Sequence, residues 1–258
     1  MKGISILTHA IGMVLNNLDT ALRISAVLMA VQFVLAILLG VQFMYLGDDP
    51  SQQMMAGNYP WGGVGLLILV QVLSALWIAV AWHRFILKDE RPAGVLPAFN
   101  GSALLSYFIA GIIFFLIVIV VAIPFGLVAG FIAMPFMMGG SFGMMLGGLI
   151  LFFLVWIPVT YVSYRISPIL PSAALENRLA LREAWYATGT SGAAFVVLAV
   201  ASAVLYWVAS LPVGWLAALS PFLGFLWAFA VNWAAMLIGA SILTTIFGHY
   251  VEKRDLNG

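Results

Sequence analysis

The sequence contains no cysteine, so disulfide bonds, thiolate catalysis, iron–sulfur clusters and cysteine-ligated zinc are excluded. Charge is also scarce: ten Lys and Arg and nine Asp and Glu make up 7% of the 258 residues and leave a net charge of +1. The basic residues are scattered in small groups and form no stripe that could neutralise nucleic-acid phosphates. We therefore expect no nucleic-acid partner.

Apolar residues make up 64% of the chain, and the mean hydropathy is +1.14. A water-soluble fold could not cover that much apolar surface with so few charges. No stretch long enough to form a soluble domain is free of membrane-like segments. The composition therefore predicts an all-α polytopic membrane bundle, with a single integral membrane domain covering residues 1–258.

Six segments are apolar enough and long enough to cross a bilayer, which takes about twenty helical residues. A β-branched run within the third segment would suit a strand in water, but a lone strand in lipid would leave its backbone unpaired. Pro124 is expected to kink the third span, and a Gly- and Met-rich turn is expected at 131–143. The predicted spans are residues 24–46, 64–85, 104–128, 144–164, 193–211 and 222–247.

The first 22 residues show apolar positions at spacings of three and four, with polar residues on the other side. This pattern predicts an amphipathic helix that lies in the membrane interface at 1–22. Asp19 and Arg23 are one helical turn apart, a spacing that allows an ion pair. The N-terminus lacks the short apolar core and small-residue cleavage site of a removable signal peptide, so we expect none.

The positions of Lys and Arg predict the orientation, because these residues gather on the cytoplasmic side of membrane proteins. With six spans, all ten fall on one side, which places both termini in the cytoplasm. These residues are Lys2, Arg23, Arg84, Lys88, Arg91, Arg165, Arg178, Arg182, Lys253 and Arg254.

Four of these arginines are candidates for contact with lipid headgroups: Arg84, Arg165, Arg178 and Arg182. General anchoring at the interface is the simpler interpretation, and recognition of a specific lipid is the alternative. Leu181, Ala184, Trp185 and Thr188 define one face of a short helix expected on the inner membrane surface, with Asn177 as its predicted cap.

Four uncharged polar residues are candidates at bilayer depth: Gln32, Gln71, Ser202 and Asn232. Hydrogen bonds between helices are the ordinary role of such residues, and a polar lining for a solute path is the alternative. No Asp, Glu, Lys, Arg or His lies near the midpoint of a predicted span, so we do not expect a proton-coupled pump.

Catalytic, cofactor and metal sites are not predicted, because the sequence lacks a nucleophile elbow, a His-Glu-x-x-His run and a phosphate-binding loop. A lipid-modifying enzyme would need one of the histidines His9, His83 or His249 to lie beside one of the acids Asp19, Asp89 or Glu252.

Outer methionines could offer thioethers to Cu(I), but flexible apolar filling is their commoner role. These are Met54, Met55, Met134, Met137, Met138, Met144 and Met145. Nearby glycines indicate close helix contacts: Gly139, Gly140, Gly143, Gly147 and Gly148.

The second inner loop carries a resemblance to a known group. Residues 164–176 read Tyr-Arg-Ile-Ser-Pro-Ile-Leu-Pro-Ser-Ala-Ala-Leu-Glu, followed by Leu-Arg-Glu-Ala-Trp at 181–185 and by Thr188-Gly189. This segment resembles one found in uncharacterised bacterial multi-helix membrane proteins related to the membrane domain attached to some glycerophosphodiester phosphodiesterases. The resemblance implies a multi-pass protein of the bacterial cytoplasmic (inner) membrane. It implies no hydrolase activity, because the catalytic domain of those enzymes is absent.

The sequence as a whole predicts a non-enzymatic inner-membrane protein that serves as an accessory, organising or assembly subunit through helix and lipid contacts. Its expected partners are membrane lipids and either another membrane protein or a second copy, and no cofactor is expected. The alternative is a channel or carrier for an uncharged or lipophilic solute. A shared cavity lined by the polar residues would favour the carrier, whereas closed contacts between helices would favour the subunit.

Overall fold

The computed structural model describes residues 2–41, 57, 59–92 and 94–256, and these contain helices but no strand. Six helical stretches among them are long and apolar enough to cross a membrane, and each overlaps one predicted span. The all-α polytopic architecture is therefore confirmed. Residues 42–46 of the first predicted span lie outside the described residues, as do Met54 and Met55. The six stretches are Leu18–Leu38, Trp61–Lys88, Gly101–Met137, Gly140–Ala174, Gly192–Leu219 and Pro221–Tyr250.

The chain forms two compact units, each assembled from segments far apart in the sequence. Unit 1 comprises Met1–His9, Leu105–Ser202 and Ile242–Gly258. Unit 2 comprises residues 10–104 and 203–241. Each unit therefore combines early and late parts of the chain.

The N-terminal helix is shorter than predicted. Helix α1 (Lys2–Leu15) ends before two asparagines, and α2 (Leu18–Leu38) begins directly after them. The side-chain amide of Asn17 donates to the Met13 carbonyl at 2.8 Å, a local bond of the kind that competes with helix continuation. Residues 18–22 therefore belong to the first spanning helix and not to an interfacial one. Within α2, Asp19 and Arg23 form the ion pair that their spacing predicts, at 2.9 Å.

Helix α2 also ends eight residues before the predicted limit of the first span, and Gly40 supplies the reason. Gly40 has a φ of +66°, a left-handed conformation that glycine adopts without a steric penalty. The Gly40 amide donates to the Ile37 carbonyl, and the Val41 amide donates to the Ala36 carbonyl. These two bonds form a Schellman motif, which closes the helix by pairing its last carbonyls.

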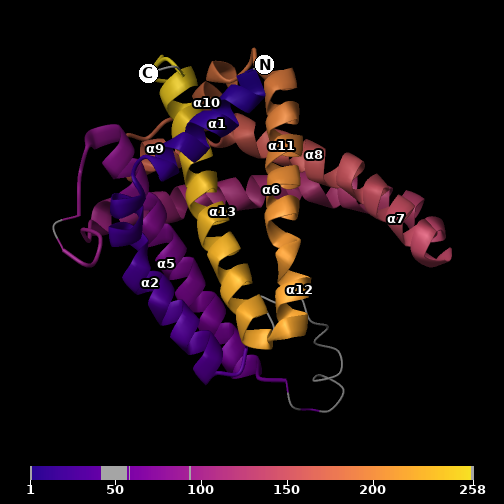
Figure 1. Ribbon diagram of the computed structural model, residues 1–258. Helices are drawn as coiled ribbons and strands as arrows, with labels where there is room; N and C mark the ends of the chain where they lie inside the picture. The colour runs from indigo at the N-terminus through magenta and orange to yellow at the C-terminus, as the bar shows by residue number, and fades with distance from the viewer. Residues whose placement is uncertain (1, 42–56, 58, 93, 257–258) are drawn as a thin grey trace. The chain divides into compact units, whose positions relative to one another are not determined.

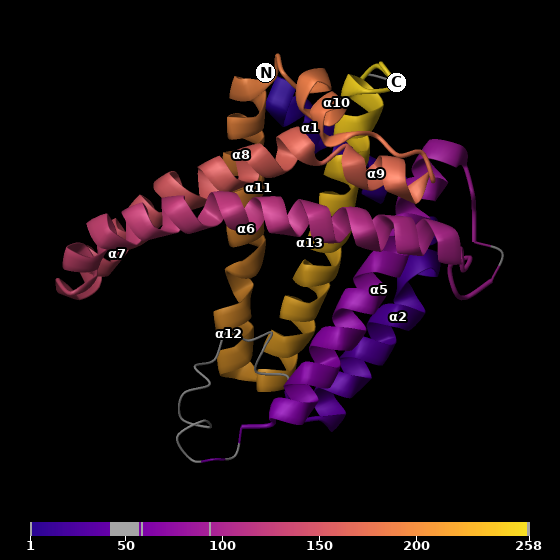
Figure 2. The ribbon, with the colours of Figure 1, turned by 180° about the vertical axis from the view of Figure 1, so that it is seen from behind.

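Unit 2 is organised around α2, α5 (Trp61–Lys88) and α13 (Pro221–Tyr250) as far as Ser241. Helices α2 and α5 lie side by side (Figures 1 and 2). The indole of Trp82 donates to the Ser241 hydroxyl at 2.8 Å, and the indole of Trp233 donates to the Ser25 hydroxyl at 2.8 Å. Both serine hydroxyls donate in turn to carbonyls of their own helices. Two indole–serine bonds thus fasten α13 to both other helices.

A close glycine contact fixes the turn between α12 (Pro212–Leu219) and α13, which follow α11 (Gly192–Ser210). A Cβ at Gly224 would lie 2.8 Å from the Ala217 Cα, too close for any real side chain. Glycine at this position therefore lets the two helices meet within a short connection.

Unit 1 contains a long helical hairpin of α6 (Gly101–Met137) from Leu105, α7 (Gly140–Leu151), the π-helical turn η1 (Phe152–Trp156) and α8 (Ile157–Ile166). Helix α6 runs antiparallel to the other three (Figure 2). It continues through Pro124 and Pro135, so the reversal is much shorter than the expected turn at 131–143 and takes place at 138–139, within that range. Proline is tolerated inside membrane helices because surrounding groups can satisfy the freed carbonyl.

Glycines bring the two arms of the hairpin together near its tip. Gly139, Gly143 and Gly147 recur every fourth residue and so share one helix face. A Cβ at Gly143 would overlap the Phe136 carbonyl oxygen, and one at Gly147 would lie 3.4 Å from the Ala133 carbonyl oxygen. The predicted close backbone approach is therefore confirmed at these three glycines, but it is wrong for Gly140 and Gly148, where a Cβ would have no atom within 4 Å.

The π-helical turn has a local cause in Pro158. The Ile157 amide donates to the Phe152 carbonyl, five residues earlier, where an α-helix would use the fourth. Pro158 follows immediately and has no amide hydrogen, so the regular ladder is interrupted there in any case. The wider turn lets the chain enter α8 without breaking the helix.

The hairpin tip provides a direct test of this packing. We expect Gly143→Ala to destabilise the protein by about 1–3 kcal/mol, because the added methyl meets a backbone carbonyl that cannot move aside. Gly148→Ala is the matched control, since a Cβ there has no atom within 4 Å. Thermal unfolding in detergent would compare the two variants. Equal stability of the two would contradict the described contact.

Candidate functional site

A buried arginine at the end of α8 is the most constrained polar feature of unit 1. Arg165 is only 7% exposed. Its Nε donates to the Thr188 hydroxyl at 3.0 Å, its Nη1 to the Tyr161 hydroxyl at 2.9 Å and its Nη2 to the Trp185 carbonyl at 2.7 Å. Its guanidinium carbon lies 4.0 Å from the centre of the Trp185 ring. We call these four residues the Arg165 cluster.

The positions of the cluster residues follow from helix geometry. Tyr161 and Arg165 are four residues apart on α8 and so share one face. Trp185 and Thr188 lie at the C-terminal end of α10 (Leu181–Ala187), where carbonyls lack partners in their own helix and the helix dipole is negative. Arg165 therefore caps α10 from a neighbouring helix, with a positive charge at the favourable end.

Thr188 links the two ends of the cluster. Its fully buried hydroxyl accepts from Arg165 Nε and lies 3.0 Å from the Arg165 carbonyl and 2.9 Å from the Ala184 carbonyl. A hydroxyl has one hydrogen, so it donates to one of these carbonyls at a time while still accepting from the arginine. A hydrophobic residue here would remove both roles.

The segment between α8 and α10 is held by backbone contacts around α9 (Ile169–Ala174). The Ser172 hydroxyl donates to the Ile169 carbonyl at 3.1 Å and accepts from the Leu179 amide at 3.2 Å. The predicted cap of α10, Asn177, is wrong: the N-cap is Ala180, whose amide donates to the Glu183 carboxylate at 3.1 Å. This bond from the N-cap amide to the Glu183 side chain is one of the two hydrogen bonds of a capping box. It stabilises the start of the helix although alanine has no side-chain acceptor of its own.

The arginines predicted to contact headgroups occupy three different environments. Arg178 and Arg182 are exposed, and Arg182 lies over the Tyr186 ring at 5.4 Å. Arg165 is buried with its guanidinium directed to protein groups. Arg84, in unit 2, forms a bidentate ion pair with Glu90. Headgroup contact stays a prediction for all four, and exposure favours it most at Arg178 and Arg182.

The four polar residues predicted at bilayer depth use local partners where hydrogen bonds are defined. In unit 1, the Ser202 hydroxyl donates to the Ala199 carbonyl and lies 3.3 Å from the Tyr164 hydroxyl on α8. In unit 2, the Asn232 amide donates to the Ala228 carbonyl of its own helix. Also in unit 2, Gln32 is buried and Gln71 is half-buried. Ser202 on α11 thus contacts a second helix, α8, through Tyr164.

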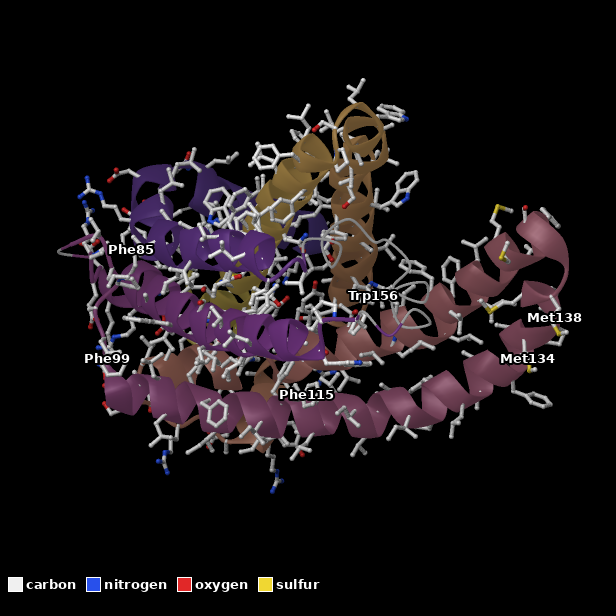
Figure 3. All side chains as sticks on the ribbon, turned by 90° about the horizontal axis from the view of Figure 1, so that it is seen from below. Phe85, Phe99, Phe115, Met134, Met138 and Trp156 are labelled. Atoms are coloured by element: carbon white, nitrogen blue, oxygen red, sulfur yellow. The ribbon has the colours of Figure 1, made fainter. Side chains whose placement is uncertain are left out.

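The structure places the metal and catalytic candidates as follows. Within the described parts of the chain, no group of three or more His, Asp or Glu could hold a metal ion. In unit 1, His249 Nδ1 lies 3.0 Å from the Arg254 carbonyl, and Glu252 pairs with the Arg254 side chain at 2.6 Å. His83 in unit 2 is fully buried. Met134 and Met138 lie exposed at the hairpin tip (Figure 3).

Comparisons with known proteins found no match among family models, curated proteins or solved structures. The geometry of the chain itself must therefore carry the functional argument. The resemblance at 164–189 stays an expectation, but its residues fold against one another, since Arg165 contacts both Trp185 and Thr188. A sequence pattern of Arg followed by Trp and Thr does not reveal this contact, because the partners lie about twenty residues apart.

The Arg165 cluster predicts that charge alone cannot replace the guanidinium. Arg165→Lys keeps the charge but cannot reach all three acceptors, and we expect a loss of about 1–3 kcal/mol for each buried polar group left unpaired. Arg182→Lys is the control on the adjacent exposed surface and should change stability by about 0.5 kcal/mol or less. Unfolding in detergent and trypsin cleavage at 176–190 would measure both. Equal behaviour of the two variants would exclude the capping role.

Proposed function

We propose that this chain is a non-enzymatic membrane protein that acts as an accessory, organising or assembly subunit through helix and lipid contacts. The observation that supports this role is the hairpin of unit 1. From Pro92 to Tyr164 the sequence contains no Asp, Glu, Lys, Arg or His. A segment without ionisable groups of these types has little means for acid–base or metal chemistry, but it is well suited to apolar surroundings along its whole length.

The length of the hairpin strengthens the argument. Helix α6 has 37 residues, which at about 1.5 Å per residue gives a length of roughly 55 Å. The hydrocarbon core of a bilayer is only about 30 Å thick. An uncharged helix of this length must tilt strongly or rest its end against another apolar surface. The length and composition of α6 therefore favour contacts with lipid or protein that an upright spanning helix would not make.

The tip of the hairpin has the composition of a contact surface. Phe131 is 84% exposed and Met138 is 80% exposed, and Met134 and Phe142 are exposed beside them. Aromatic residues and methionine are enriched where proteins meet, because they present a large apolar area that adapts to a partner. We infer that this tip contacts a partner helix or a second copy of the chain.

The polar residues give weaker support to the alternative of a channel or carrier. The Ser202 and Asn232 side chains donate to carbonyls of their own helices, and Ser202 also meets Tyr164. Groups engaged in this way offer less to a passing solute. Their placement therefore supports a packed helical subunit over a polar path.

We infer that the protein resides in the bacterial cytoplasmic membrane with both termini in the cytoplasm. An even number of spanning stretches supports termini on one side, and the ten Lys and Arg support the cytoplasmic side. The bacterial assignment rests on the resemblance at 164–189, and relation to that group is part of the proposal.

Reporter fusions test this topology. Green fluorescent protein fused after Gly258 should fluoresce, and alkaline phosphatase at the same position should be inactive, because the first works in the cytoplasm and the second only outside it. Phosphatase inserted after Asp49, in the predicted outer loop, is the matched control and should be active. The reverse pattern at the two positions would overturn the orientation.

The subunit role predicts a defined protein neighbour at the hairpin tip. A photo-crosslinking phenylalanine analogue placed at Phe131 should give one discrete crosslinked protein band in native membranes. The same analogue at Trp215, an aromatic position on α12 that is also largely exposed, is the control and should give no such band. Mass spectrometry would identify the partner as another protein or as a second copy. Lack of any protein crosslink at Phe131, together with a solitary protein after gentle extraction, would contradict the subunit role.

A further inference from the structure

The connection between α5 and α6 borders an open pocket of about 300 Å³ in unit 2. Its lining combines two arginines, Arg84 and Arg91, with the start of α6 at Gly101 and an apolar wall that includes Ile24 and Phe99. We call this the α5–α6 pocket; Phe99 is labelled in Figure 3. It mixes cationic and apolar surface, as a site for an amphiphilic anion requires.

An ion pair fixes one side of the pocket. Arg84 Nε lies 2.7 Å from Glu90 Oε2, and Arg84 Nη2 lies 2.9 Å from Glu90 Oε1. The Arg84 side chain is only 12% exposed. Asp89 adopts a left-handed φ of 53° and donates its amide to the Arg84 carbonyl, which turns the chain back toward the helix. A bidentate pair of this kind holds Glu90 in one geometry.

A tryptophan fixes the other side. The Trp77 indole donates to the Ala98 carbonyl at 3.3 Å, and the Trp77 and Phe99 rings meet edge to face with centres 5.5 Å apart. Both ends of the connection are thus fastened to α5. Glu90 on one side of the pocket and Ala98 and Phe99 on the other are therefore held against α5.

Arg91 is the cation available to a ligand. It pairs with Asp89 at 3.2 Å, but both side chains are about three-quarters exposed, and such pairs contribute little in water. Arg91 can therefore exchange Asp89 for a stronger anion at small cost. Gly101 adds the positive end of the α6 dipole to the same pocket, and Asn100 fixes that end by accepting from the Ala103 amide.

The place of the pocket along the chain indicates which anion it meets. Helix α5 ends its apolar stretch at Lys88, and α6 begins its own at Gly101. For helices that cross a membrane, this connection lies at the level of the lipid headgroups. The lining itself contains two arginines and one glutamate, and the Asp89 carboxylate that pairs with Arg91 is about three-quarters exposed, so a phosphate with no compensating ammonium is favoured as its replacement.

We propose that the α5–α6 pocket binds the headgroup of an anionic phospholipid. Arg91 and the N-terminus of α6 hold the phosphate, Arg84 and Glu90 keep the wall in place, and Phe99 and Ile24 face the glycerol and first acyl carbons. This site goes beyond the subunit role, because it belongs to the isolated chain and needs no protein partner.

Lipid retention by the purified full-length protein tests the site. The protein is placed in nanodiscs of phosphatidylcholine containing a minor fraction of phosphatidylglycerol, and retained lipids are counted by native mass spectrometry after release. We expect wild type to retain phosphatidylglycerol selectively and Arg91→Gln to retain about tenfold less, as loss of a charge-assisted hydrogen bond implies. Arg91→Lys should recover part of the binding.

Arg23→Gln is the matched control, because Arg23 is also exposed, also pairs with an aspartate and does not line the pocket. It should retain phosphatidylglycerol within about twofold of wild type, as expected for an exposed pair away from the site. Equal loss in Arg91→Gln and Arg23→Gln would show a general charge effect and overturn the proposal. Inorganic phosphate that binds through Arg91 without any lipid selectivity would also overturn it, in favour of a soluble anion. Neither result affects the crosslinking at Phe131. The lipid site and the subunit role can therefore be contradicted independently of each other.

Discussion

Lipid hydrocarbon contains no water, so polar groups buried in a membrane protein must find their hydrogen bonds within the protein. The described residues meet this constraint with few polar side chains, several of which make more than one hydrogen bond. Ser25 and Ser241 each accept from an indole and donate to a carbonyl of their own helix. Thr188 does the same between Arg165 and a carbonyl. Within the described chain, Tyr250 carries the one buried side-chain oxygen without a hydrogen bond.

Arg84, near the end of α5, and Arg165, near the end of α8, show how one residue type satisfies this constraint in two ways. Arg84 is neutralised by the Glu90 carboxylate at a half-buried position. Arg165 is more deeply buried, and within the described residues it has neutral acceptors and an aromatic face but no carboxylate partner. The C-terminal end of α10 supplies the missing negative potential through its carbonyls. Arg165 therefore has a structural role, because it holds α10 against α8. Near Arg84, a second arginine, Arg91, is exposed, and it is the residue that we propose binds lipid.

The sequence predicts the number and type of the spans because apolar length is a signal that each segment carries alone. It fails where the outcome depends on a few backbone bonds. Gly40 ends α2 through its left-handed conformation, while Pro124 and Pro135 leave α6 intact. In the Arg165 cluster, the residue types and their general place at the interface were predictable, but the contact of Arg165 with Trp185 was not. That contact depends on how α8 and α10 pack, and no spacing rule encodes it.

An exposed apolar surface is ordinary for a protein in lipid and does not by itself indicate a partner, because lipid chains are as apolar as leucine. The hairpin is unusual for a different reason. Its arms pack closely near the tip, where a Cβ at Gly143 would overlap the Phe136 carbonyl oxygen and one at Gly147 would lie 3.4 Å from the Ala133 carbonyl oxygen. Helix α6 is longer than the hydrocarbon is thick, and no Asp, Glu, Lys, Arg or His occurs from Pro92 to Tyr164, so the far end of this helix cannot be exposed to water at low cost. If the hairpin tilts to fit within the bilayer, its tip at Phe131 and Met138 extends sideways from the rest of unit 1. Lipids or another protein must then cover this tip. In either case the tip requires apolar surroundings.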